Sequence, residues 1–197
     1  MKIVVGLSGA SGAIYGIRML EACKALSIET HLVVSAWAEV TIKQETEYSL
    51  DQVYGLANYV YPNQDMGAAI SSGSFRHDGM VIIPASMKTV AALAHGFTDN
   101  LIHRAADVTM KEKRKLILVP RETPLHVIHL RNLLTLAEVG TAIIPPMPAL
   151  YQKPVTVGEI VDHLVARVLD QLGVEHNMIH RWTGIPNAPS LGPRGED

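Results

Sequence analysis

Residues 2–12, Lys-Ile-Val-Val-Gly-Leu-Ser-Gly-Ala-Ser-Gly, decide the fold of this chain. The apolar run 3–7 is typical of a buried strand, and the glycines and serines after it are typical of a tight turn before a helix. At a helix N-terminus the first main-chain N–H groups have no partner within the helix, and the helix dipole adds partial positive charge. The stretch therefore predicts a strand, a turn and a helix N-terminus whose unpaired amides hold an anionic ligand, such as the phosphate of a nucleotide or cofactor.

Four further apolar runs, rich in β-branched residues, lie at 30–34, 80–83, 115–119 and 141–144. Segments with helical spacing separate them, and no run alternates apolar and polar residues as a half-exposed strand would. Strands that are buried on both faces and alternate with helices predict an α/β fold. We expect a Rossmann-like (flavodoxin-like) three-layer domain with a mostly parallel sheet.

Helical spacing and capping residues predict helices over about 11–26, 36–45, 87–95 and 156–171. The periodicity fades over 48–65, which predicts a surface loop or a short helix. We expect one domain over 1–185 and a C-terminal tail, 186–197, whose prolines and glycines predict a flexible or subunit-contacting segment.

Composition narrows the class of protein. A formal net charge of −2 and a pI of about 6.5 indicate no general attraction for nucleic acid. The single cysteine, Cys23, excludes an intrachain disulfide, fits a reducing compartment and lies in a helical apolar pattern, so we expect a buried structural thiol. No apolar run approaches the roughly 20 residues of a membrane span, and no signal peptide precedes the first strand, so we expect a cytoplasmic protein. A hydrophobic fraction of 48% predicts surface buried between subunits of a homo-oligomer.

The residues that follow the predicted strands are the first candidates for a site, because α/β sheets bind ligands beyond the carboxyl ends of their strands. Ser35 follows the second run, where a dinucleotide-binding protein would have an acidic residue, and a small hydroxyl favours a mononucleotide or flavin phosphate. Ser86-Met87-Lys88-Thr89 follows the third run and Arg121-Glu122 the fourth. Each also has a simpler interpretation, as an ordinary helix cap and as a local ion pair.

Other cations and a tyrosine extend this candidate site. Arg104 and Lys111 are seven residues apart, so they project from one helix face and are placed to clamp a phosphate. Arg167 flanks the apolar stripe of the last predicted helix, and a partly buried arginine needs an anion, which Tyr151 is placed to share. The nine histidines show no spacing typical of metal ligands, and no Gly-x-Ser-x-Gly motif of hydrolases occurs.

Taken together, several motifs resemble those of the flavin prenyltransferases of the UbiX type, formerly named phenylacrylic or aromatic-acid decarboxylases, within the homo-oligomeric flavin-containing cysteine decarboxylase superfamily. The resemblance covers about 1–182 and rests on Gly-Leu-Ser-Gly-Ala-Ser-Gly-Ala, Pro-Ala-Ser-Met-Lys-Thr, Arg-Ala-Ala-Asp-Val, Leu-Val-Pro-Arg-Glu-Thr-Pro-Leu, Pro-Pro-Met-Pro-Ala-Leu-Tyr and Ala-Arg-Val-Leu-Asp.

The resemblance implies a homo-oligomer, commonly a dodecamer, that transfers a dimethylallyl group from dimethylallyl phosphate to N5 and C6 of reduced FMN without a metal. The product, prenylated FMN, would serve a UbiD-type decarboxylase in ubiquinone biosynthesis or aromatic-acid decarboxylation. An FMN-dependent cysteine decarboxylase and a non-catalytic FMN-binding subunit remain the alternatives.

The resemblance also assigns roles to individual residues. It implies that the residues that bind FMN are Gly9, Ala10, Ser11, Ser35, Ser86, Met87, Lys88, Thr89 and Arg121. It implies that Tyr151 and Arg167 hold the dimethylallyl phosphate, with Arg104 and Lys111 contributed by a neighbouring subunit. The implied catalytic residues are Glu122, Ser11 and Glu45, of which Glu122 resembles the acid/base that handles the proton lost from the flavin ring.

Overall fold

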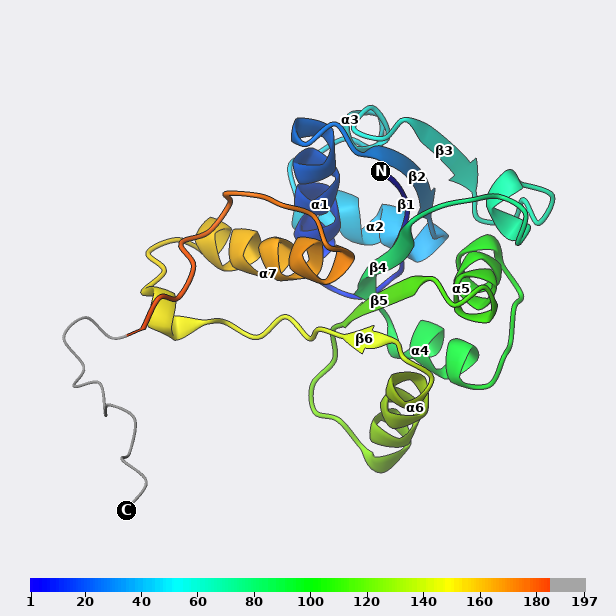
Figure 1. The fold of residues 1–197 in the computed structure, drawn as a ribbon. Coiled ribbons are helices and arrows are strands. Elements are labelled where there is room, and N and C mark those ends of the chain that lie inside the picture. Colours follow the sequence, from blue (N-terminus) through cyan, green and yellow to red (C-terminus); the bar gives the residue numbers. More distant parts are fainter. Residues whose placement is uncertain (185–197) are drawn as a thin grey trace, which may run out of the picture.

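In residues 1–184, which the computed structural model describes, six strands form one sheet in the order β3-β2-β1-β4-β5-β6 (Figure 1). Every neighbouring pair is parallel. The strands are β1 (Lys2–Leu7), β2 (Glu29–Val34), β3 (Tyr59–Pro62), β4 (Gly79–Ala85), β5 (Lys115–Pro120) and β6 (Ala142–Ile143). The predicted α/β fold with a mostly parallel sheet is confirmed.

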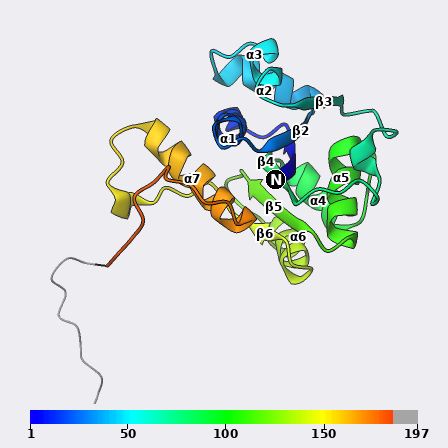
Figure 2. The same cartoon turned by 45° about the horizontal axis from the view of Figure 1, so that its top comes forward.

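Helices cover both faces of the sheet. They are α1 (Ala13–Ala25), α2 (Ala36–Glu45), α3 (Leu50–Tyr54), α4 (Met87–Ala94), α5 (Leu101–Lys111), α6 (Val127–Glu138) and α7 (Val157–Leu172), with short 3₁₀ turns η1 (Ala69–Ser71) and η2 (Leu150–Gln152). Figures 1 and 2 show α1 and α7 on one side of the sheet and α4, α5 and α6 on the other. The four helices predicted from spacing are therefore present as α1, α2, α4 and α7, within about two residues at each end.

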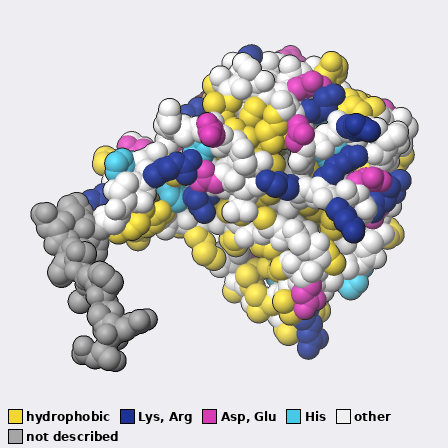
Figure 3. Space-filling model, in the orientation of Figure 1, with side chains coloured by type: hydrophobic (Ala, Val, Ile, Leu, Met, Phe, Trp, Pro, Cys, Tyr) yellow, Lys and Arg dark blue, Asp and Glu magenta, His cyan; other side chains and the backbone are white. Residues whose placement is uncertain are grey.

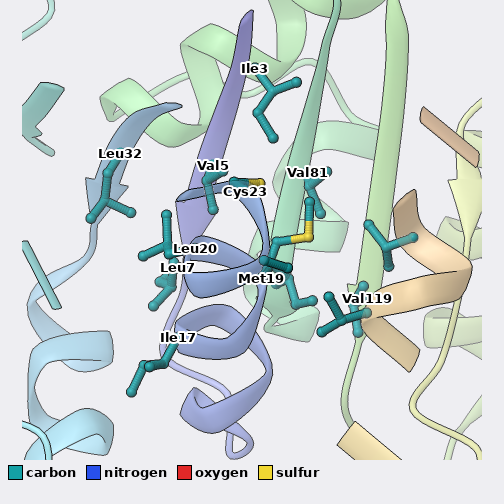
Figure 4. Close-up of a cluster of buried hydrophobic side chains, with 14 of the residues drawn as sticks. Ile3, Val5, Leu7, Ile17, Met19, Leu20, Cys23, Leu32, Val81 and Val119 are labelled. Atoms are coloured by element: carbon teal, nitrogen blue, oxygen red, sulfur yellow. The ribbon is translucent and has the colours of Figure 1, made fainter. Parts of the chain in front are cut away.

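The core has one layer on each face because consecutive residues of a strand point to opposite sides. Val5 and Leu7 of β1 pack against α1 and belong to the cluster of Figure 4, which also includes residues of α7. Val4, the residue before Val5, points to the other face and belongs to the opposite cluster, which α4 and α5 complete. Burying both faces explains why the strand runs are continuously apolar.

Cys23 lies fully buried in the first of these clusters. Burial raises the pKa of its thiol to about 12, so the side chain stays protonated and packs as a small apolar group. The prediction of a buried structural thiol is confirmed.

The edge strand β3 was not predicted, because it lies in the stretch 48–65 for which a loop or short helix was expected. The short helix exists as α3, but residues 59–62 pair with β2 in parallel. β3 is largely exposed and ends in Pro62, so it lacks the buried apolar run that marks the other strands. The predicted tail, 186–197, lies outside the described residues. Across residues 1–184 no helix combines the length and the hydropathy of a membrane span.

Candidate active site

A pocket of about 440 Å³ opens at the carboxyl ends of β1, β2 and β4, beside the point where the strand order turns from β1 to β4. This is where doubly wound sheets bind ligands, and the volume suits a small molecule. The pocket is lined by Ser8, Gly9, Ser35, Ala36, Trp37, Asn63, Gln64, Ser86, Lys88, Thr89, Asn100, Ile102 and His103. Five of the residues predicted to bind FMN are thus brought together: Gly9, Ser35, Ser86, Lys88 and Thr89.

Three helices begin at this pocket. The capping side chains of α2, α4 and α5 are Ser35, Ser86 and Asn100, and all three line it. Each accepts a main-chain N–H of the first helical turn, at 3.1 to 3.3 Å. Because each helix N-terminus carries partial positive charge, the convergence of three of them, together with the Lys88 ammonium, favours an anionic group in the pocket.

The N-terminus of α1, by contrast, already has an anion. The Glu45 carboxylate accepts the N–H groups of Gly12 at 2.8 Å and Ala13 at 3.0 Å. The expectation that unpaired amides of the opening loop hold the phosphate is therefore wrong at these two residues. The loop contributes Ser8 and Gly9 to the pocket instead.

Glu45 also joins two other predicted site residues. Burial acts to raise the pKa of Glu45, but the two main-chain N–H groups, the Ser11 hydroxyl and the positive charge of Arg121 outweigh it and lower this pKa. Glu45 is therefore a carboxylate at neutral pH. Ser11, Glu45 and Arg121 form a second group, separate from the residues that line the pocket.

Ser8 ties the end of β1 to the end of β4. Its hydroxyl donates to the carbonyl of Pro84 at 3.0 Å and accepts the N–H of Ser86 at 2.7 Å. Ser8 is almost fully buried, so these bonds are shielded from water. Sequence reasoning missed this residue, although its place at the end of the first strand was the signal that could have found it.

Trp37, on the first turn of α2, lies against Gly9 at the pocket. A Cβ atom added at Gly9 would collide with the Cβ of Trp37, so only glycine permits this approach. Trp37 is 71% exposed, which is unusual for so large an apolar side chain. Four further pocket residues were not predicted from the sequence: Trp37, Asn63, Gln64 and His103. Asn63, Gln64 and His103 follow no predicted strand, and Trp37 was assigned only to the second predicted helix.

Arg121 and Glu122 follow β5, as predicted. The main-chain N–H of Arg121 donates to the carbonyl of Ala85, which fixes the end of β5 beside that of β4. Both side chains are exposed, and the Glu122 carboxylate accepts the N–H of Thr123 at 3.0 Å. Met87, also predicted at the site, is buried at the start of α4.

The residues predicted to hold the prenyl donor lie elsewhere on the chain. Tyr151, in η2, meets His163 of α7 at 3.3 Å, next to a second cavity of about 290 Å³ between η2, α7 and residues 178–180. Arg167 was expected to be partly buried, but its side chain is 49% exposed, and its anion is Asp170 at 2.7 Å. One chain does not bring Tyr151 or Arg167 to the pocket of Ser8 and Ser86.

Arg104 and Lys111 of α5 are likewise paired within the chain. Arg104 donates to the carbonyl of Ser71 and to Asp107, and Lys111 lies 2.6 Å from Glu112. The roles of both cations toward a neighbouring subunit stay predictions. Among the described residues no group of three His, Cys, Asp or Glu side chains is placed to hold a metal ion.

Comparison with known proteins identifies the class. The Flavoprotein family model matches residues 1–169. Fold and sequence therefore define a flavin-binding α/β protein of this family.

Individual relatives narrow the class further. A probable UbiX-like flavin prenyltransferase of Bacillus subtilis (strain 168) is 55% identical over 185 residues, which cover 94% of this chain and 91% of the relative. The crystal structure of a dodecameric FMN-dependent UbiX-like decarboxylase from Escherichia coli O157:H7 is 54% identical, with a TM-score of 0.92, and covers 93% of this chain and 100% of that chain. The crystal structure of AnUbiX (PadA1) in complex with FMN and dimethylallyl pyrophosphate is 50% identical, with a TM-score of 0.92, and covers 93% of this chain and 98% of that chain. The chain belongs to the UbiX-like flavin prenyltransferases, as its motifs predicted.

Proposed function

We propose that this flavin prenyltransferase holds FMN in the pocket of Ser8, Ser35 and Ser86 and transfers a dimethylallyl group from dimethylallyl phosphate to N5 and C6 of the reduced flavin. The main support for placing FMN here is that three capped helix N-termini line one pocket of a flavoprotein. Such a pocket suits the phosphate of FMN. The relative AnUbiX binds FMN together with dimethylallyl pyrophosphate.

The chemistry explains why cations are needed around the donor. When the allylic C–O bond breaks, phosphate leaves with the electron pair and the dimethylallyl fragment becomes positive. Arg167 and Tyr151, with Arg104 and Lys111 of another copy, would stabilise the leaving phosphate. N5 would then form a bond to the allyl fragment and give up its proton. Protonation of the remaining alkene would make a tertiary carbocation, to which C6 would bond before losing its own proton. Glu122, an exposed carboxylate held by the N–H of Thr123, is the proposed proton acceptor.

We infer that the chain acts as a homo-oligomer, and the dodecamer of the Escherichia coli relative supports this state. Support also comes from the apolar face of α6, where Val127, Ile128, Leu130 and Leu134 are each more than half exposed. Figure 3 shows apolar side chains gathered over the part of the molecule where α6 lies. Assembly would also give Tyr151, Arg167, Arg104 and Lys111 a route to the FMN pocket of a neighbour.

The test is direct. Purified protein is incubated anaerobically with reduced FMN and dimethylallyl monophosphate or diphosphate, and the flavin is extracted for mass spectrometry. A flavin heavier by one prenyl unit is the expected product, and no gain in mass with either donor contradicts the proposal. Carbon dioxide release from a cysteinyl peptide would instead favour the cysteine decarboxylase. A non-catalytic FMN-binding subunit would bind FMN without forming a heavier flavin, and Glu122→Gln and Arg167→Ala would leave its function intact.

We further propose that the protein works in the cytoplasm and supplies its product to a UbiD-type decarboxylase, in ubiquinone biosynthesis or aromatic-acid decarboxylation. Reaction product from this protein should activate an apo-decarboxylase of that type, whereas FMN alone should not. Genomic neighbourhood of a decarboxylase gene would indicate which pathway it serves.

A further inference from the structure

One buried histidine faces the pocket and has no role in the chemistry above. His103, in the first turn of α5, lines the pocket although it is only 3% exposed. Its Nδ1 lies 2.8 Å from the Asp99 carboxylate. Its Nε2 lies 3.4 Å from the hydroxyl of Thr89, at the long end of the hydrogen-bond range, and Thr89 is itself buried and lines the pocket.

The chain of contacts continues from Thr89 to the cap of α4. The Thr89 hydroxyl lies 3.1 Å from the Ser86 hydroxyl, which also accepts the Thr89 N–H. Ser86 in turn donates its N–H to Ser8. A continuous series of hydrogen bonds therefore runs from Asp99 to the floor of the pocket, through His103, Thr89 and Ser86.

Asp99 determines which ring nitrogen of neutral His103 carries the proton. A carboxylate only accepts hydrogen bonds. The amide nitrogen of Asn100 also lies close to Nδ1, at 2.9 Å, but its shorter contact is the hydrogen bond that it donates to Asp99, at 2.7 Å, so Nδ1 and this amide both point hydrogens at the carboxylate. Nδ1 therefore holds the hydrogen, and Nε2 presents a lone pair that the Thr89 hydroxyl can donate to. While the hydroxyl donates to Nε2, its single hydrogen is not free to donate into the pocket.

We propose that His103 is a positioning residue of the FMN site, and that the proton it gains turns the Thr89 hydroxyl away from Nε2 and toward the phosphate of FMN. Once Nε2 is protonated it can only donate, so Thr89 accepts from it and its own hydrogen is released for the phosphate. The imidazolium adds a positive charge beside the anion. This inference rests on the proposed FMN site.

The charges around His103 show why the proton arrives together with the ligand. Burial lowers its pKa, Asp99 acts against burial by favouring the charged ring, and Lys88 of α4 lowers the pKa further. The ring is therefore neutral in the empty pocket at neutral pH. A bound phosphate brings negative charge that favours the imidazolium, so proton uptake and FMN binding are linked.

The experiment compares two ligands at several pH values. Dissociation constants of FMN and riboflavin are measured by flavin fluorescence for the full chain and for His103→Gln, between about pH 5.5 and about pH 8. The phosphate of FMN itself titrates near pH 6. The measure of the effect of His103 is therefore the dissociation constant of His103→Gln divided by that of the unchanged chain at the same pH. We expect this ratio to rise to about ten-fold for FMN as the pH falls, and to stay near one for riboflavin, which lacks the phosphate.

His77→Gln is the matched control, because His77 is also buried and has a pKa lowered mainly by burial, but lies before β4, at the opposite end of that strand. It should leave both dissociation constants unchanged. A ratio for His103→Gln that does not vary with pH overturns the proposal, and so does an equal loss of FMN and riboflavin binding.

A second variant keeps the proposal testable if His103→Gln folds poorly. Thr89→Val removes the hydroxyl, and calorimetry in buffers of different ionisation enthalpy should then show less proton uptake on FMN binding than in the unchanged chain. Uptake that Thr89→Val does not reduce contradicts the proposal. Ser35→Ala and Ser86→Ala test the proposed FMN site separately from the role of His103. Unchanged FMN affinity in both variants would mean that FMN binds elsewhere.

Discussion

The carboxylate of Glu45, at the last residue of α2, accepts the main-chain N–H of Gly12 at 2.8 Å. The N-terminus of α1 is thereby neutralised by the chain itself, in a protein whose first glycine-rich loop suggests a phosphate cradle. The N-termini of α2, α4 and α5 are the ones that line the pocket. This division leaves the first loop to shape the pocket through Ser8 and Gly9.

Replacing Glu45 with glutamine should lower the free energy of unfolding by about 1 kcal/mol at neutral pH, because the amide keeps one acceptor but loses the charge at the helix N-terminus. The folded state lowers the pKa of Glu45, so its contribution is complete above the unfolded value, near 4.5, and is lost as the pH falls through the folded value. Denaturant unfolding at neutral and acidic pH measures this. Glu47→Gln, at an exposed position, is the control. If Glu45→Gln lost the same unfolding free energy at about pH 3 as at about pH 7, the role assigned to the charge of Glu45 would be contradicted.

Gly9→Ala should weaken FMN binding at least about ten-fold, because the new Cβ displaces Trp37 and with it the first turn of α2. Flavin fluorescence measures the affinity. Gly158→Ala is the matched control, since the nearest atom to a Cβ there is 3.6 Å away, at ordinary contact distance, and no effect on FMN is expected. Unchanged affinity in Gly9→Ala would show that the contact between Gly9 and Trp37 does not shape the site.

Asp170→Asn should destabilise the fold by about 2 kcal/mol and raise the KM for the prenyl donor. Asp170 binds two arginines and a histidine of the described chain: it accepts from Arg167 at 2.7 Å and Arg181 at 2.8 Å, and it lies 3.1 Å from Nε2 of His176. Burial acts to raise the pKa of Asp170, but its contacts, led by Arg181 and Arg167, outweigh burial and lower this pKa, so the stabilisation should disappear as the pH falls below about 3.8.

The matched control for Asp170→Asn is Asp107→Asn. Asp107 makes a pair of the same spacing with Arg104 on α5, but its side chain is about twice as exposed as that of Asp170. The expected cost is below about 1 kcal/mol, as for exposed pairs generally. Equal losses in the two variants would mean that Asp170 does no more than an ordinary surface ion pair.

Ile128→Glu combined with Leu134→Glu should dissociate the proposed oligomer, because a charge buried at an apolar interface has no partner. Both side chains are 58% exposed on α6 in the single chain. Light scattering after size exclusion measures the mass. Leu26→Glu, at the end of α1, controls for added charge, and an unchanged mass in the α6 variant would place the interface elsewhere.

Local patterns were enough to predict the sheet and the serines at its edge. The apolar runs of β1, β2, β4 and β5 identify strands buried on both faces, and strands buried in this way bring the residues after them to one edge. Ser35 and Ser86 were recognisable because each follows such a run and precedes a helix. The family motifs added the identity of the cofactor and the reaction, which no apolar pattern carries.

Tertiary structure decided the features that join residues distant in the sequence. The hydrogen bond from Gly12 to Glu45 spans 33 positions of the sequence, and the bond from Ser8 to Pro84 spans 76. No local sequence pattern predicts contacts over such separations. β3 escaped prediction because an exposed edge strand needs no apolar run, and His103 because a buried polar group is recognised only by its partners. A sequence determines which segments must be buried, whereas the choice of partner for each polar group is made by the packing that brings the segments together.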